Sequence, residues 1–292
     1  MKSIVSDEEL IEIFLDSFDS HGTRVTYRRR ISYFQEFLDE RRLGVTDCAA
    51  DTIRKFISTR YKDLGDSSTR LQMAVLKSLF KFGVKSGYLR SNIMSEFTLP
   101  KIKPYRTFDE MAADDQIIEL LDHIDAETLK GIRQRALVCL HYYGLLKISE
   151  ALSLRHCDVL DTNEGYKVRI CRQSKERVIS ILGDGVKYLK DYIDVLPSSA
   201  IGETPLFIGT KGKGSAFATD VRFNGTVANT HLVDYRRDAG VSESITFEFM
   251  RQAGLRRFIK SGGTLTDARE LYGCKSIDTI EKILGNRLQT PR

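Results

Sequence analysis

The sequence predicts a mainly helical protein in two domains, with a small β-hairpin in the second domain. Apolar residues recur at helical spacing in the first hundred residues, as in the stripe from residue 27 to 38. Two runs rich in β-branched residues lie close together at 166–171 and 177–182. A segment with two prolines and three basic residues, 99–106, separates the two regions and disfavours helix. We therefore expect a helical domain at 1–98, a linker at 99–108 and a second domain at 109–292.

The bulk composition fits a soluble globular protein and limits the classes of function. The chain has 292 residues, of which 41% are hydrophobic and 29% charged, enough for a packed core. Its net charge of +5 permits a nucleic-acid partner without requiring one. No apolar run approaches the roughly 20 residues that span a bilayer, and the N-terminus does not resemble a signal peptide. We expect a cytoplasmic (nucleoid-associated) protein with no membrane partner.

The five cysteines indicate neither a disulfide framework nor a metal site. Their number is odd and none forms a Cys-x-x-Cys pair. Cys139, in an apolar helix, and Cys171, in a predicted strand, are expected to be small buried side chains. We expect no metal and no cofactor.

The first domain is expected to contain four helices. Ser6 and Glu9 form a capping box for a helix that ends near residue 18. A second helix is predicted at 23–40, and a third at 51–64 with Asp51 as its N-cap. The fourth runs from a cap at Ser67 or Ser68 to Lys85.

The fourth helix carries a basic face. Arg70, Lys77, Lys81 and Lys85 fall within a narrow arc, opposite a buried side that is expected to include Leu71 and Val84. The face is either a solvated surface or a surface that contacts a phosphate backbone. The arginines at 28–30 on the second helix favour the phosphate interpretation.

The second domain alternates helices with one hairpin. Residues 172–175 are expected to connect the two strands, and residues 209–214 to form an exposed loop. The helices are predicted at 109–124, 127–143, 149–154, 185–195, 225–239, 247–260, 265–272 and 276–284.

Several segments together resemble the tyrosine recombinase (phage integrase) family. Residues 26–38 and 67–87 are similar to its helical, SAM-like core-binding domain. The catalytic boxes appear in the family's order over nearly the whole second domain: 135–158 for the first arginine, 175–179 for the end of the hairpin that bears the lysine, 246–252 for the His-x-x-Arg box and 270–274 for the last histidine. The resemblance implies a core-binding domain followed by a catalytic-type α+β domain.

The resemblance also implies a chemistry. In this family a tyrosine hydroxyl attacks a DNA phosphate and forms a 3′-phosphotyrosyl link without a metal. Two arginines and imidazole or indole donors bind the charged phosphorane, and a lysine protonates the departing 5′ oxygen.

Carried over residue by residue, the family's active-site positions are largely substituted. Only the second arginine is retained. Lys147 stands at the position of the first arginine, Arg172 at that of the lysine and Glu248 at that of the first histidine. Arg251 is the second arginine, Cys274 stands at the position of the last histidine, and Ile283 at that of the nucleophile. Arginine is a poor proton donor, and isoleucine has no nucleophilic atom.

Two of these residues have more than one interpretation. Glu248 precedes Arg251 by three residues on one helix, so the two are expected to pair. Arg251 is then either a phosphate ligand or an ion-pair residue without a role in DNA binding. Tyr272 is either a core residue or a displaced nucleophile. His141, His156 and His231 are expected to be structural.

Our first hypothesis is therefore a sequence-specific DNA-binding protein on an inactivated recombinase fold, a repressor of a phage or mobile element and not an enzyme. The alternative is an active or accessory recombinase whose nucleophile is displaced to Tyr272 or supplied by a partner subunit. Both predict double-stranded DNA as partner, with self-association on DNA or pairing with an active recombinase. The expected DNA-binding residues are Arg28, Arg70, Lys77, Lys81, Lys147, Arg172, Lys175 and Arg251.

Overall fold

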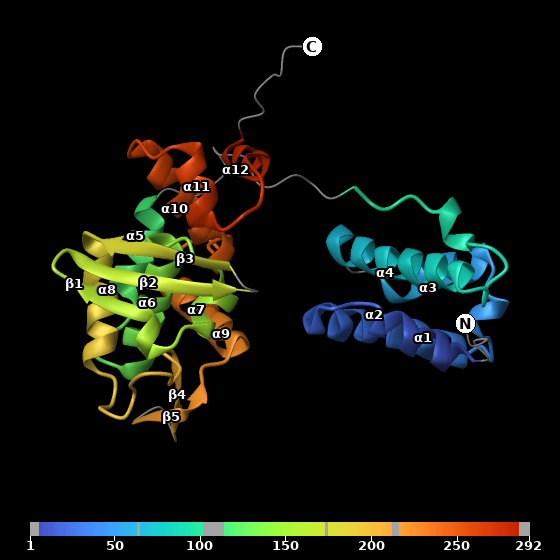
Figure 1. Ribbon diagram of the computed structural model, residues 1–292, viewed down its shortest axis with the longest axis horizontal. Coiled ribbons are helices and arrows are strands. Elements are labelled where there is room, and N and C mark those ends of the chain that lie inside the picture. The colour runs from blue at the N-terminus through green and yellow to red at the C-terminus, as the bar shows by residue number, and fades with distance from the viewer. Residues whose placement is uncertain (1–5, 63–64, 102–113, 173–174, 212–215, 286–292) are drawn as a thin grey trace, which may run out of the picture. The chain divides into compact units, whose positions relative to one another are not determined.

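The chain divides into two compact units in the computed structural model, residues 1–104 and 105–292. The structure describes residues 6–62, 65–101, 114–172, 175–211 and 216–285 (Figure 1). Most of the predicted linker, residues 102–108, lies outside the described residues, as does the start of the helix predicted at 109–124.

The first unit is helical. It contains α1 (Asp7–Asp16), α2 (His21–Asp39), α3 (Ala50–Arg60) and α4 (Asp66–Lys85), with short 3₁₀ turns η1 (Val45–Asp47) and η2 (Ile93–Glu96). The Ser6 hydroxyl accepts the Glu9 amide at 3.1 Å, as the predicted cap requires. Buried aromatic rings fill the space between the helices, with Phe34 and Phe37 both packed edge-on against Phe56.

Three predictions for this unit are wrong in detail. The cap of α3 is Ala49, so Asp51 lies inside the first turn, where the helix dipole stabilises its carboxylate. The cap of α4 is Gly65, with Ser67 and Ser68 already helical. Leu71 and Val84 are each 36% exposed because they lie at the margins of the apolar stripe.

The second unit combines helices with two small sheets. Its helices are α5 (Asp114–His123), α6 (Leu129–Tyr142), α7 (Ile148–Ser153), α8 (Asp184–Asp194), α9 (Gly225–Asp238), α10 (Phe247–Lys260), α11 (Leu265–Tyr272) and α12 (Ile277–Leu284), with the 3₁₀ turn η4 (His156–Asp158). Its strands are β1 (Val159–Thr162), β2 (Gly165–Arg172), β3 (Lys175–Leu182), β4 (Ile208–Lys211) and β5 (Ala216–Arg222). The β4–β5 hairpin and the α11–α12 pair lie at opposite ends of this unit (Figure 1).

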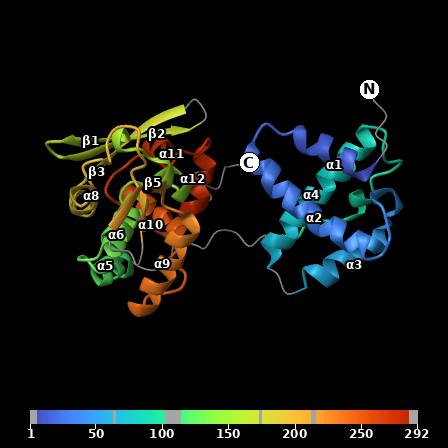
Figure 2. The same ribbon diagram turned by 90° about the horizontal axis from the view of Figure 1, so that it is seen from below.

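The predicted hairpin is the centre of a three-stranded antiparallel sheet, in the order β1-β2-β3. Val168 and Ile170 on β2, and Ile179 and Ile181 on β3, face the core, and the sheet covers one side of the helices (Figure 2). Cys171 lies on the opposite face and is exposed, so its predicted burial is wrong. Strand alternation places it there, because successive side chains point to opposite faces.

Three strands, β1, β4 and β5, were not predicted from the sequence. β1 is a four-residue edge strand, and β4 and β5 form a separate hairpin. Residues 209–211 of the predicted exposed loop belong to β4. Short strands with charged and glycine residues give little apolar signal, so pairing geometry rather than composition defines them.

Candidate active site

The centre of the candidate site is α10, which carries both Glu248 and Arg251. Thr246 caps this helix by accepting the Phe249 amide at 3.1 Å. Glu248 stands in the first turn, where the helix dipole favours a carboxylate. Its oxygens lie 3.4 Å from Arg251 Nη1, which confirms the predicted pair.

Arg251 is buried and bound on several sides. Its side chain is only 2% exposed, whereas that of Glu248 is 51% exposed. Arg251 Nε donates to the Leu145 carbonyl at 2.7 Å, and Nη2 donates to the Tyr272 carbonyl. Leu145 holds a φ of 58°, a conformation that costs energy for a leucine and turns its carbonyl toward the guanidinium. The retained arginine is thus fixed from two segments besides its own helix.

Tyr272 is the tyrosine that the fold places at this arginine. Its ring centroid lies 3.4 Å from Arg251 Cζ, in cation–π contact. Its hydroxyl donates to Glu248 Oε1 at 2.7 Å, across 24 residues of sequence. The ring is buried, as predicted for a core residue, but the phenol oxygen has a charged carboxylate partner. A phenol, a carboxylate and a guanidinium are therefore in mutual contact.

The last two family positions, Cys274 after α11 and Ile283 on α12, have structural contacts. Ile283 is 3% exposed and packs with Leu145, Tyr272 and Ile280 in a small apolar cluster. Cys274 is half-buried, and its thiol lies 3.3 Å from the Ser276 carbonyl oxygen.

Lys147 opens α7, and a buried ion pair lies beside it. The Lys147 amide donates to Glu150 Oε2 at 2.9 Å. Arg177 on β3 donates to both oxygens of Glu150, at 2.8 and 3.1 Å. Burial alone would raise the pKa of Glu150, but the hydrogen bonds from Arg177 and the Lys147 amide hold that pKa below its usual value. Arg177 was not among the predicted site residues, although it lies two residues before Ile179 on the core-facing side of β3.

Arg172 and Lys175 are paired residues at the end of the hairpin where β2 connects to β3. They end β2 and begin β3, directly opposite each other. Residues 173 and 174 between them lie outside the described part of the chain.

The predicted basic residues of the first unit occupy α2 and α4. Arg28 is exposed and pairs with Glu12 of α1, with Nη2 2.7 Å from Oε2. Arg70 Nη1 donates to the Pro100 carbonyl at 2.6 Å. Lys77 is half-buried and Lys81 is exposed, one helical turn apart. The structure thus leaves α4 with a basic face but ties Arg28 and Arg70 to neighbours.

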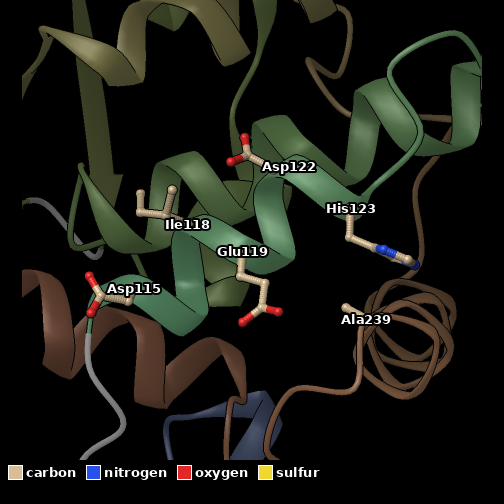
Figure 3. A pocket seen from close by; sticks show the side chains of 6 residues that line it. All are labelled: Asp115, Ile118, Glu119, Asp122, His123 and Ala239. Carbon is tan, nitrogen blue, oxygen red and sulfur yellow. The ribbon is translucent and has the colours of Figure 1, made fainter.

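A hollow on the second unit has the opposite charge. Asp115, Glu119 and Asp122 of α5 line it together with His123, and Ala239 closes it from the end of α9 (Figure 3). Carboxylates repel a phosphate backbone, so this hollow is not a DNA site. Among the described residues, no group of His, Cys, Asp and Glu side chains is arranged to hold a metal ion.

The predicted structural histidines differ in environment. His141 is fully buried on α6; its Nδ1 lies 2.6 Å from the Leu137 carbonyl oxygen and its ring packs on Phe247. Burial lowers the pKa of His141 to about 4. His231 is half-buried on α9, and burial with nearby Lys130 and Arg133 lowers its pKa to about 4. His156 begins η4.

The two-unit fold is that of the tyrosine recombinases. A lambda integrase dimer bound to a COC′ core site is similar with a TM-score of 0.74 at 13% identity, over 99% of this chain and 79% of that one. XerH site-specific recombinase bound to palindromic difH substrate gives a TM-score of 0.69 at 16% identity, over 97% and 82%.

Sequence comparison identifies the family. The model described as "Phage integrase family" matches residues 111–283, and that described as "Phage integrase, N-terminal SAM-like domain" matches residues 10–87. The chain belongs to the phage integrase family.

The curated relatives carry the name of an enzyme. Tyrosine recombinase XerC of Rickettsia canadensis is 28% identical over 272 residues, covering 90% of this chain and 85% of the relative. Tyrosine recombinase XerC of Rickettsia typhi is 27% identical over 295 residues, covering 95% and 92%.

These relatives overturn two expectations. The hypotheses of a transcriptional repressor and of a protein that is not an enzyme are wrong, because nearly full-length relatives are recombinases by name. Both expectations rested on Ile283, which has no nucleophilic atom. The fold instead places the Tyr272 hydroxyl within hydrogen-bonding distance of Glu248 and its ring on Arg251.

Among the helices that the structure describes, none is long and apolar enough to cross a membrane.

Proposed function

We propose that this protein is a site-specific DNA recombinase of the tyrosine class, with duplex DNA as substrate and Tyr272 as its nucleophile. The single observation that carries the assignment of the nucleophile is the contact of Tyr272 with both Glu248 and Arg251. The named recombinases that match over 85–92% of their length support the reaction type.

The chemistry follows from the three groups. The Tyr272 oxygen attacks the phosphorus of a scissile phosphate while its proton passes to the Glu248 carboxylate, 2.7 Å away. The bond from phosphorus to the 5′ oxygen breaks, and that oxygen takes a proton from solvent. The product is a 3′-phosphotyrosyl link, which the reverse attack by a 5′ hydroxyl rejoins. Arg251 stabilises the charge that gathers on the phosphate oxygens.

For phosphate to reach Arg251, some present contacts must exchange. The Glu248 carboxylate lies 3.4 Å from Arg251 Nη1, which is long for a charged pair. Protonation of Glu248 would weaken this ion pair. Proton transfer from Tyr272 would therefore neutralise Glu248 as negative charge builds on the phosphate. The proton transfer therefore removes the repulsion between the Glu248 carboxylate and the phosphate during the attack by Tyr272.

Further phosphate contacts would come from basic residues in both units. Lys77 and Lys81 on α4 present adjacent ammonium groups at the spacing of one helical turn. We also assign phosphate contacts to Arg28, Arg70, Lys147, Arg172 and Lys175, of which Arg28 would have to leave Glu12.

A covalent trap tests the proposal. Duplexes that bind the protein at about 0.15 M salt are selected from a random library. A set of these duplexes, each with a single nick at a different internucleotide step, is then incubated with the protein. We expect a protein–DNA adduct on a denaturing gel for the wild type, none for Tyr272→Phe, and wild-type yield for Tyr166→Phe. Tyr166 is a matched control because it is buried to a similar degree on β2. A bound duplex that gives no adduct at any nick would remove the proposal.

A second candidate is an accessory subunit that acts with an active recombinase. The observation that favours it is Ile283, an apolar core residue at the family's nucleophile position. In that case an adduct would form only on addition of the active partner, and it would persist in Tyr272→Phe.

A further inference from the structure

We propose that Arg177 is a positioning residue that couples the β2–β3 hairpin to Tyr272 through Gly273. The inference rests on the proposed function, because it gives Tyr272 the role of nucleophile. Arg177 matches none of the family's active-site positions and touches none of the reacting groups.

Arg177 is itself rigidly held. Its guanidinium makes two parallel hydrogen bonds to Glu150, whose side chain is only 4% exposed. Glu150 also accepts the Lys147 amide at 2.9 Å, so the carboxylate is fixed by the first turn of α7. A bidentate, largely buried ion pair of this kind fixes both the orientation and the position of the arginine side chain.

The guanidinium lies directly against Gly273, the residue after Tyr272. A Cβ atom at Gly273 would stand 2.8 Å from Arg177 Cζ and closer still to Nη1. Gly273 has a φ of 65°, which ends α11 and turns the chain. Because Arg177 occupies the space of a side chain, it restricts where the α11 terminus can settle.

The same turn is held from a second direction by Arg251, whose Nη2 donates to the Tyr272 carbonyl oxygen. One arginine comes from β3 and the other from α10. Together they fix the peptide that follows the phenol, so a displacement of β3 moves Tyr272 relative to Glu248. Since β3 begins at Lys175, next to Arg172, contact of the hairpin with DNA would be transmitted to the nucleophile.

The test compares two glycines with nearly the same positive φ. Gly273→Ala adds a methyl group against Arg177, whereas Gly240→Ala adds one at φ 68° with nothing within 4 Å. Both variants place an alanine at a positive φ of similar value, so the difference between them reports the contact with Arg177. Adduct formation is followed on the selected nicked duplex at saturating protein, and DNA affinity is measured separately.

We expect Gly273→Ala to slow adduct formation at least tenfold relative to Gly240→Ala, with DNA affinity within about threefold of wild type. Arg177→Lys, which lacks the planar fork, should slow the step alone but restore part of the rate when combined with Gly273→Ala. Equal rates for the two alanine variants, or strictly additive effects in the double variant, would overturn the inference.

A spectroscopic readout separates this inference from the proposed function. With 3-fluorotyrosine at position 272, the ¹⁹F resonance should shift in Gly273→Ala and in Arg177→Lys but not in Gly240→Ala. If the wild type forms no adduct while the resonance responds, the recombinase proposal fails and the positioning of Tyr272 stands. If the resonance is the same in all variants, the positioning role is refuted whatever the activity.

Discussion

The buried imidazole of His141 should make the second unit lose stability in mild acid. The ring is fully buried on α6 against Phe247, and its pKa is lowered to about 4, below the ordinary value near 6.5. Between these two values the unfolded chain binds a proton that the folded chain excludes. The stability due to this group is complete above pH 6.5 and declines as the pH falls toward 4.

The two pKa values set the magnitude. At pH 5 the unfolded histidine is mostly protonated and the folded one is about one-tenth protonated, which corresponds to a loss of about 2 kcal/mol relative to pH 7.5. His231 has the same direction of shift and adds its own, smaller share because it is only half-buried. The share of His141 is isolated by comparing the wild type with a variant at that position alone.

His141→Leu is the informative variant. Leucine fills similar space beside Phe247 and removes the titrating group. Urea unfolding of the second unit at pH 7.5 and pH 5 should show a pH-dependent loss about 2 kcal/mol smaller in His141→Leu than in the wild type. An NMR titration of the five histidines should show two imidazoles with midpoints near 4, those of His141 and His231, and only the resonance of His141 should be missing in this variant. The reasoning is refuted if both proteins lose equal stability, or if the His141 resonance titrates near 6.5.

Two further predictions concern packing and DNA contact. Gly254→Ala should destabilise the second unit by about 1–3 kcal/mol, because a methyl group there would lie 2.8 Å from Leu145 Cδ2 and closer still to the Tyr142 carbonyl oxygen. Urea unfolding measures this loss. The control is Gly22→Ala on an open helix face, which should be neutral or slightly stabilising. Replacing Lys77 and Lys81 together by glutamine should reduce the slope of log affinity against log salt by about 1.8, or about 0.9 per lost phosphate contact, in a DNA titration. An unchanged slope would show that α4 does not face the backbone, and a Gly254→Ala protein as stable as wild type would contradict the close helix packing.

Local signals were sufficient for features whose partners are close in sequence. The Ser6 cap, the α4 basic face and the pair of Glu248 with Arg251 all follow from spacings of three, four or seven residues, and the structure contains the cap and the pair. The hairpin followed from β-branched runs, although its strands extend to Arg172 and Lys175.

Features that depend on packing between distant elements could not be read from the sequence. The bond from Tyr272 to Glu248 depends on how α11 lies on α10, and the contact of Arg177 with Gly273 depends on how α11 meets β3. The family's nucleophile position falls on Ile283, and sequence alignment ties each site residue to one place in the chain. A side chain from elsewhere can occupy the same space, and sequence spacing alone does not reveal it.

The most direct test of the account is the identity of the residue bonded to DNA. The wild-type protein is trapped on a nicked duplex that it binds, digested with protease and nuclease, and its peptides are sequenced by mass spectrometry. We predict a nucleotide-bearing peptide that includes residues 270–274, with the modification on Tyr272. A modified residue other than Tyr272, or unmodified peptides throughout from fully bound protein, would contradict the central claim.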